Sequence, residues 1–238
     1  MRYLFYLLAC FATLCASAQL SLDASAGVFS WSIGGSGDRY EDELVQEPGP
    51  AWAVGLNCNN RPDSAWVGLG FGMRYERREF DVAYGNGGLG GGTRGEEYVR
   101  LGSLYINLGL NVKIHSNRRW WARPSMAVLC VNEGVASGWS RSWSMNGGGA
   151  SAVYKDKYIN EYGAPFFLSF ELEHLQPLGP LWFIAYCAFA AQSFSLRPDH
   201  APYGRFQYQL GTGLTVGVQL GDGLDLALMR DREARKGH

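Results

Sequence analysis

Side chains that can do nucleophilic or acid–base chemistry are few in this sequence, and one adjacent pair stands out. His115 and Ser116 are followed by Asn117. A nucleophile and its general base must point toward one another, whereas successive side chains of a strand point to opposite faces. The tripeptide also falls at a predicted turn between strands. We therefore expect no catalytic residues here and no enzymatic activity for the chain.

Two further patterns match cofactor or metal sites only in part. Residues 85–90 read Gly-Asn-Gly-Gly-Leu-Gly, but a dinucleotide site requires a strand before these glycines and a helix after them, and we expect a flexible loop instead. The histidines are too far apart in sequence for the spacing of a zinc site, and we expect no metal and no cofactor. They are His115, His174, His200 and His238.

Aromatic and cationic side chains gather between residues 132 and 163. Such rings beside cations can stack on sugars or hold anionic head groups, which makes this segment the candidate surface-binding loop. The alternative is that the rings form an aromatic girdle and the small core of the loop. The residues concerned are Trp139, Arg141, Trp143, Tyr154, Lys155, Lys157, Tyr158 and Tyr162.

Composition limits the classes of protein to consider. The 238 residues include 32 glycines, 14% are aromatic and only 18% are charged, a mixture typical of twisted strands with aromatic girdles. The net charge of −1 provides no basic field for nucleic acid. We therefore expect no nucleic-acid partner.

The clearest element that could position side chains lies between residues 100 and 115. From Leu104 to Ile114 every even position is aliphatic, and the odd positions are polar, small or amphipathic. Strict alternation predicts a β-strand with one apolar face. Its length matches the nine to eleven residues, roughly, of a tilted membrane-spanning strand.

The first eighteen residues have the pattern of a secretory signal peptide. Arg2 provides the positive start, Tyr3 to Leu14 the apolar stretch, and Ala16-Ser17-Ala18 the small-residue cleavage site before Gln19. We predict cleavage after Ala18, with lipoprotein processing at Cys10 as the alternative. No later apolar run reaches the roughly eighteen residues of a membrane helix, so any spanning requires a closed barrel.

Seven other segments also favour strands, at residues 20–31, 51–58, 65–77, 120–131, 166–173, 181–194 and 206–220. The connections between the eight strands alternate in length. Loops are expected at 34–49, 80–97, 132–163 and 196–204, and turns at 59–64, 115–119 and 176–180. In the first strand the alternation breaks at Phe29 and Trp31, which suggests a bulge or an exit at an aromatic belt. Cys58, Cys130 and Cys187 are expected as small buried residues in strands.

This layout resembles the small eight-stranded outer-membrane barrels, which include the OmpA transmembrane domain, OmpX and barrel proteins abundant in Bacteroidetes. The resemblance covers residues 19–221 and rests on the signal peptide and on strand sequences such as 105–110 and 210–214. It implies an all-β, antiparallel, up-and-down transmembrane barrel in the outer membrane, with residues 222–238 as a charged periplasmic tail. The chain departs from the family in ending on this tail, at His238, rather than on an aromatic residue.

If the aliphatic faces meet lipid, the opposite faces point into a lumen that side chains can fill. Charges there must be paired, because an unpaired buried charge is strongly destabilising. We expect a network of both signs that plugs the lumen, with Glu171 or Glu173 paired with Arg74, Arg123 or Lys113. The full predicted set is Asp23, Arg74, Glu76, Lys113, Arg123, Glu171 and Glu173.

The sequence thus favours a non-enzymatic outer-membrane barrel with a structural, adhesive or partner-binding role. Its expected partners are outer-membrane lipid or lipopolysaccharide, and a surface glycan or protein at the outer loops. One alternative is a lipid-modifying barrel enzyme, which needs a Ser or His beside a carboxylate at the lipid face. The other is a soluble, secreted, lipocalin-like barrel, in which the aliphatic faces point inward.

Overall fold

The computed structural model describes residues 20–34, 45–61, 66–88, 90–114, 119–159, 165–179, 181–194 and 206–220. These residues form antiparallel strands. The strands are β1 (Leu20–Gly34), β2 (Val45–Asn60), β3 (Val67–Gly88), β4 (Gly91–Lys113), β5 (Trp120–Ser144), β6 (Gly149–Ile159), β7 (Phe166–Pro177), β8 (Trp182–Phe194) and β9 (Phe206–Leu220). In the described part of the chain there is no helix long and apolar enough to cross a membrane.

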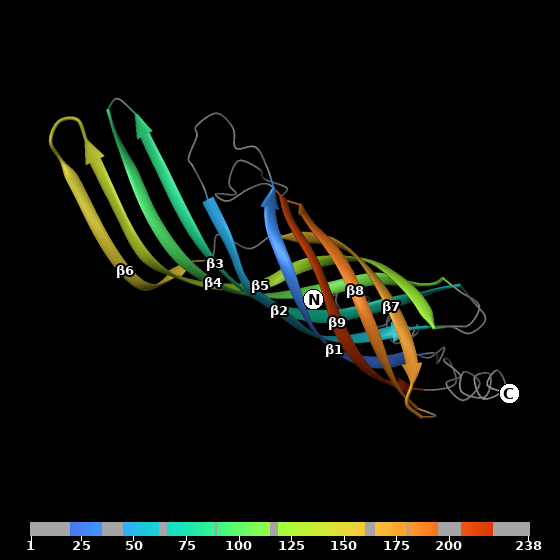
Figure 1. Ribbon diagram of the computed structural model, residues 1–238. Helices are drawn as coiled ribbons and strands as arrows, with labels where there is room; N and C mark the ends of the chain where they lie inside the picture. Colours follow the sequence, from blue (N-terminus) through green and yellow to red (C-terminus); the bar gives the residue numbers. More distant parts are fainter. Residues whose placement is uncertain are drawn as a thin grey trace, which may run out of the picture.

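Eight of these strands close into a barrel (Figure 1). Neighbours in sequence pair from β1 to β5, then β5 pairs with β7, and β7, β8 and β9 follow. The seam is the pairing of β1 with β9, which runs without a shift from Leu20 opposite Leu220 to Gly34 opposite Phe206. The predicted eight-stranded, up-and-down barrel is therefore confirmed.

The two ends of the barrel differ. At one end, here called the turn end, short connections join β2 to β3, β4 to β5 and β7 to β8, and Leu20 lies beside Leu220. At the opposite end, here called the hairpin end, β3, β4, β5 and β6 continue well beyond the other strands (Figure 1).

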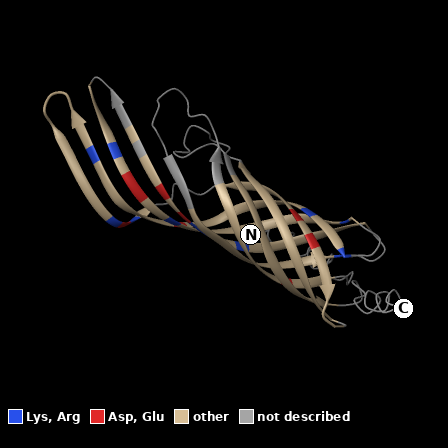
Figure 2. Cartoon of the chain, in the orientation of Figure 1, with Lys and Arg blue, Asp and Glu red and all other residues tan. Residues whose placement is uncertain are grey.

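Apolar side chains cover the outside of the barrel wall. In β4 the even positions face outward, with Leu108 53% and Leu110 44% exposed, whereas Tyr105 and Asn111 on the odd positions are buried. The charged side chains of Asp23, Arg123 and Glu173 in the wall strands are buried, and Figure 2 shows further charged residues on the strands beyond the hairpin end. This polarity rules out the lipocalin-like alternative, which requires aliphatic side chains inside the barrel.

The expected bulge at Phe29 and Trp31 is absent. β1 keeps one register with β9 throughout, and both aromatic side chains point into the lumen, where they are 6% and 4% exposed. The alternation appeared to break because the inward face changes there from polar to aromatic. The strand itself does not change direction.

Beyond the hairpin end the chain forms a four-stranded sheet rather than the expected loops. This sheet, here called the blade, consists of residues 79–88, 91–101, 134–144 and 149–159 in the order β3, β4, β5, β6. Residues 80–97 and 132–163 were expected to be irregular, and β2 begins at Val45 inside the expected loop 34–49. The loop predictions at 80–97 and 132–159 were wrong because hairpins continue into these segments, whereas residues 35–44 and the expected loop 196–204 lie outside the described residues.

β5 is the strand that links the barrel to the blade. Along one side, its first half pairs with β7 and its second half pairs with β6. On its other side, the pairing with β4 shifts between Leu104 and Tyr105, so that Cys130 is the extra residue of a bulge. This shift explains why apolar residues occupy both parities in 126–131. At the far end, the Met145 amide donates to the Gly90 carbonyl at 3.2 Å, which joins the two hairpin tips.

The three cysteines of the described strands are unpaired with one another. Cys58 and Cys187 are half-buried, but Cys130 is exposed at the bulge, contrary to the expectation that it is buried. The signal peptide expected at 1–18 and the tail expected at 222–238 lie outside the described residues.

Candidate functional site

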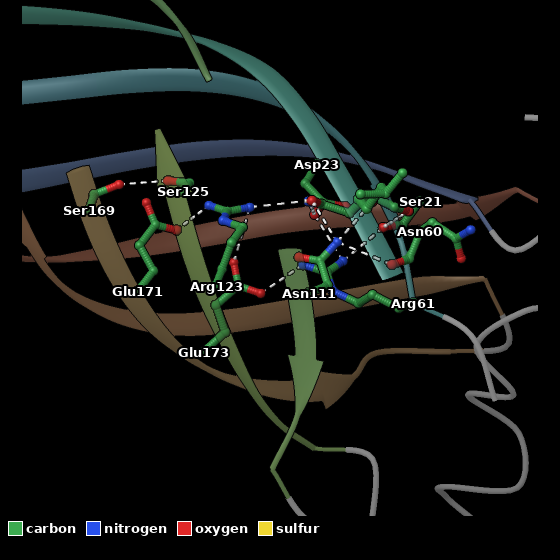
Figure 3. Close-up of polar contacts among 12 residues, drawn as sticks. Ser21, Asp23, Asn60, Arg61, Asn111, Arg123, Ser125, Ser169, Glu171 and Glu173 are labelled. Atoms are coloured by element: carbon green, nitrogen blue, oxygen red, sulfur yellow. Dashed lines mark hydrogen bonds and ion pairs between the residues drawn. The ribbon is translucent and has the colours of Figure 1, made fainter. Parts of the chain in front are cut away.

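Arg61 is the centre of an ion network inside the turn end of the lumen (Figure 3). It directly follows β2, and its side chain is 1% exposed. Its Nη1 donates to Asp23 Oδ2 at 2.9 Å and to Ser21 Oγ at 2.8 Å, and its Nη2 donates to Glu173 Oε2 at 2.7 Å. The guanidinium fork thereby joins β1, β2 and β7, a geometry that a lysine would not reproduce.

Arg123 extends the network across β5 and β7. It lies directly opposite Glu171 in the strand register, and the two side chains form an ion pair. Its Nη1 is also 3.6 Å from Glu173 Oε1. Glu173 is therefore held between two guanidinium groups although it is 1% exposed.

Amide side chains complete the network at the β2–β3–β4 wall. Asn59 Nδ2 donates to Asp23 Oδ2 at 2.6 Å, and Asn111 Nδ2 donates to Asn59 Oδ1 at 3.1 Å. Gly70 leaves the space for these amides, because a Cβ there would collide with the Asn59 side-chain oxygen. The glycine-rich inward face of β3 is thus a packing requirement.

A second polar group lies nearer the hairpin end. Arg74 Nε is 3.0 Å from Glu76 Oε1, and Gln209 Nε2 donates to Glu76 Oε2 at 2.9 Å. The Arg74 guanidinium carbon also lies 4.3 Å from the centre of the Phe189 ring and 5.6 Å from that of Phe29. This cation is therefore held by one carboxylate and two aromatic faces.

Arg78 continues this second group. Its Nη2 donates to Tyr105 Oη at 3.3 Å and to Ser103 Oγ at 3.5 Å, and its Nε is 4.0 Å from Glu76 Oε2. Its guanidinium carbon lies 5.8 Å from the ring centre of Trp31. The polar group therefore ends against the aromatic residues at the hairpin end.

A cavity of about 30 Å³ separates the two polar groups. Arg74 lines it from one side and Arg123 with Glu171 from the other, and Asn57 and Cys187 contribute to its wall. A polar space of this size holds one or two water molecules.

Apolar clusters lie in the lumen on both sides of the polar groups. The cluster at the turn end consists of Trp121, Leu175, Phe183 and Ala185, all 1% exposed or less. The larger cluster at the hairpin end consists of Phe29, Trp31, Ala51, Ala53, Phe80, Val82, Val99, Leu101, Ala136 and Phe189. A third cluster consists of Tyr105, Ala127, Phe167 and Ala191.

All seven residues of the predicted lumen network point into the barrel. Lys113 differs from the rest in its contact, since its Nζ lies 5.5 Å from the ring centre of Trp66. The buried members are Asp23, Glu76, Lys113, Arg123 and Glu173, and the half-buried members are Arg74 and Glu171.

The prediction missed Arg61 and Arg78, which are each 1% exposed. Arg61 had been assigned to a turn, and Arg78 lies just beyond the predicted strand 65–77. The alternation of inward and outward side chains could have revealed both arginines. Asn57 and Asn59 precede Arg61 on the inward positions of β2, and Glu76 precedes Arg78 on β3. Extending each alternation by one step places both arginines in the lumen.

The predicted surface-binding residues divide between the two faces of the blade. The face that continues the barrel exterior, here called the outer face, carries Trp139, Arg141 and Trp143 at alternate positions of β5. On the opposite face, Tyr154 forms a hydrogen bond with Glu97 and packs against the hairpin-end cluster. The remaining positions are Lys155, Lys157 and Tyr158, exposed on β6, and Tyr162, which lies outside the described residues.

The base of the outer face is covered by paired charges. Arg100 Nη2 donates to Asp156 Oδ1 at 2.6 Å, and Arg77 Nη2 is 3.6 Å from Glu79 Oε1. Tyr98 Oη donates to Glu79 Oε2 at 2.6 Å. This hydrogen bond, followed by partial burial and the charge of Glu79, raises the pKa of Tyr98 above its ordinary value.

The patterns considered for catalysis and cofactor binding are placed only in part by the described residues. His115 and Ser116 lie outside the described residues. Residues 85–88 belong to β3 and Gly90 to the turn that follows, so the expected flexible loop is largely strand. Within the ranges that the structure describes, no three His, Cys, Asp or Glu residues are grouped so as to hold a metal ion.

Three solved structures are similar to this chain. Ail, the attachment invasion locus protein of Yersinia pestis, was solved in complex with the heparin analogue sucrose octasulfate; it is 12% identical, with a TM-score of 0.37 over 83% of this chain and 97% of Ail. Neisserial surface protein A is 12% identical, with a TM-score of 0.34 over 84% of this chain and 97% of that protein. The outer membrane protein OprG of Pseudomonas aeruginosa is 10% identical, with a TM-score of 0.31 over 84% and 96%.

No protein-family profile and no curated protein sequence matches the chain. The barrel is established by the strand pairings of the chain itself, which close into a ring of eight.

Proposed function

We propose that the chain is an integral outer-membrane barrel, exported by its signal peptide, that holds the blade outside the membrane as a binding surface. The observation that carries the proposal is the inverted polarity of the barrel. Leu56, Leu108 and Leu210 are each more than half exposed, whereas Asp23, Arg61 and Glu173 are buried. A soluble protein does not expose a continuous apolar surface of this extent.

The height of the apolar wall fits a membrane. Ten residue steps separate Leu104 from Ile114, which is about 33 Å along a strand and about 25 Å at the tilt of such barrels. Trp66, Trp120 and Trp182 are exposed at the turn end, where aromatic residues of a membrane girdle lie. The proposed partners of the wall are therefore outer-membrane lipid and lipopolysaccharide.

The proposed role is structural and binding rather than catalytic or conducting. Three apolar clusters and two paired polar groups occupy the lumen between the ends of the barrel. The blade, in contrast, is not needed to close the barrel, because β1, β2, β7, β8 and β9 complete the wall with 12 to 16 residues each. We infer that the blade contacts a surface glycan or protein.

Reconstitution of the purified full-length chain tests this proposal. We expect extraction only with detergent, a shift in gel migration on heating, and no stable current steps in a planar lipid bilayer. A chain that stays soluble and monomeric without detergent would contradict the membrane location. Stable current steps from the properly folded barrel would contradict the closed lumen while leaving the membrane location intact.

A further inference from the structure

The outer face of the blade carries a pair of arginines that no described carboxylate neutralises. Arg94 on β4 lies directly opposite Arg141 on β5, and both side chains are exposed. Like charges at directly opposed positions of a sheet are destabilising. Within the described residues, neither guanidinium takes part in an ion pair or a hydrogen bond, unlike Arg77 and Arg100 at the base of the same face.

Tryptophan rings flank this pair along β5. Trp139 and Trp143 lie two residues on either side of Arg141, which is about 7 Å in each direction along a strand. Trp139 Nε1 donates to Glu96 Oε2 at 3.3 Å, so that the acidic residue next to Arg94 on this face is already engaged. Trp143 is 44% exposed. Two aromatic faces therefore border the paired positive charges.

The residues around the pair have small side chains. Gly85 lies opposite Arg94 on its β3 side, Ser151 lies opposite Arg141 on its β6 side, and Trp143 lies between Gly92 and Gly149. Such neighbours leave the two guanidinium groups and the Trp143 ring accessible, whereas Trp139 is half-buried. We call Arg94, Trp139, Arg141 and Trp143 the platform.

We propose that the platform binds an acidic oligosaccharide, with one sulfate or carboxylate group held between Arg94 and Arg141 and sugar rings stacked on the two tryptophans. Guanidinium groups bind such anions through paired, charge-assisted hydrogen bonds, and aromatic faces provide apolar contact area for the rings. Binding of the anion would also relieve the repulsion between the two arginines. The inference rests on the proposed function, because it requires the blade to project from the membrane.

The test uses the full-length chain in lipid nanodiscs and three probes: a heparin oligosaccharide, a polygalacturonate oligosaccharide and a neutral dextran oligosaccharide. We expect binding of at least one acidic probe and no binding of dextran. A preference between the acidic probes identifies the anion as sulfate or carboxylate. Equal binding of dextran, or no binding of either acidic probe, would overturn the proposal.

Charge-matched variants locate the site. The double substitution Arg94→Gln/Arg141→Gln should raise the Kd for the acidic probe about tenfold or more, because two charge-assisted contacts are lost. The control Arg77→Gln/Arg100→Gln removes the same charge from the same face, where each guanidinium is already paired, and should change the Kd by less than about twofold. An equal loss in both variants would show unspecific electrostatic attraction and reject the platform.

A separate variant tests the contribution of the tryptophan rings to binding, apart from the charge of the two arginines. Trp143→Ala should weaken binding of the acidic probe but leave the dependence of the Kd on salt concentration unchanged, since the indole carries no charge. Unaltered affinity would exclude Trp143 from the site. Heat-dependent gel migration of every variant, measured in parallel, reports whether the barrel itself is folded, so that failure of this inference is distinguishable from failure of the proposed membrane barrel.

Discussion

Glu173 illustrates how single side chains stabilise the interior of this barrel. Its carboxylate lies between Arg61 and Arg123, at 2.7 Å and 3.6 Å, and is nearly inaccessible to solvent. The removal of water from such a group is strongly unfavourable, and only the two cations and the hydrogen bond from Arg61 compensate for it. The stability of the network therefore depends on having every partner present.

Replacing Glu173 by Gln should lower the free energy of unfolding by about 3–5 kcal/mol, because two buried guanidinium groups lose a shared counter-charge. Denaturant titration of the barrel in lipid vesicles measures this difference. The matched control is Glu79→Gln, whose carboxylate is partly exposed, and this change should be within about 1 kcal/mol of the native protein. Equal effects of the two substitutions would show that burial does not determine how much these ion pairs contribute to the free energy of unfolding.

The sequence predicted the direction of individual side chains better than the contacts that they form. Alternation placed Asp23, Arg123 and Glu173 inside the barrel, because side-chain direction in a strand follows parity. It could not show which of these charges meet, since the tilt and register of the strands determine that. Arg61 was missed because turn-forming neighbours concealed that it continues the inward face of β2.

The blade shows how strand elements can escape detection in a sequence. In the barrel wall, lipid on one side and a packed lumen on the other impose alternation. Beyond the membrane neither face is apolar throughout, and residues 85–92 and 147–149 are rich in glycine. These segments resembled loops, yet residues 85–88, 91, 92 and 149 belong to strands because each pairs with a residue of a neighbouring strand, whereas 147 and 148 lie in the turn between β5 and β6.

Arg94 also affects the stability of the blade. The substitution Arg94→Glu replaces a like-charged cross-strand pair by an opposite-charged one and should stabilise the blade by about 0.2–1 kcal/mol. Slower hydrogen exchange of blade amides would report this gain, with Arg94→Gln intermediate between the two. Faster exchange in Arg94→Glu would contradict the register. The same variant should lose binding of the acidic probe, so that stability and binding change in opposite directions.

In the whole molecule, exposed apolar side chains cover the barrel wall and paired charges lie in its interior. The strand count and up-and-down order were predictable, because eight amphipathic segments were separated by connections of alternating length. The packing of the lumen was not, since β8 is apolar on both faces and its pattern does not show which residues face inward. Phe183 and Phe189 proved to be inward residues, 0% and 5% exposed.

The proposed location of the wall in a bilayer can be tested by placing a charged side chain at different heights on the wall. Leu108 lies in the middle of the apolar face of β4, and Ile114 lies at its turn end. Leu108→Arg should lower the free energy of unfolding in lipid vesicles by about 2–4 kcal/mol, and Ile114→Arg by about 0–1 kcal/mol, because the penalty depends on depth in the bilayer. Both positions are exposed, so a barrel surrounded by water would tolerate them equally.

The seam between β1 and β9 has a consequence for folding. It joins residues about as far apart as the chain allows, Leu20 with Leu220, so that its formation depends on the completion of nearly every other pairing. Until then, β1 and β9 are open edges whose amide and carbonyl groups have no partners, and in hydrocarbon each such group is destabilising by several kcal/mol. In the proposed membrane barrel, a chain that lacks only this pairing is therefore strongly destabilised. For this reason we expect insertion and closure to be a single cooperative event.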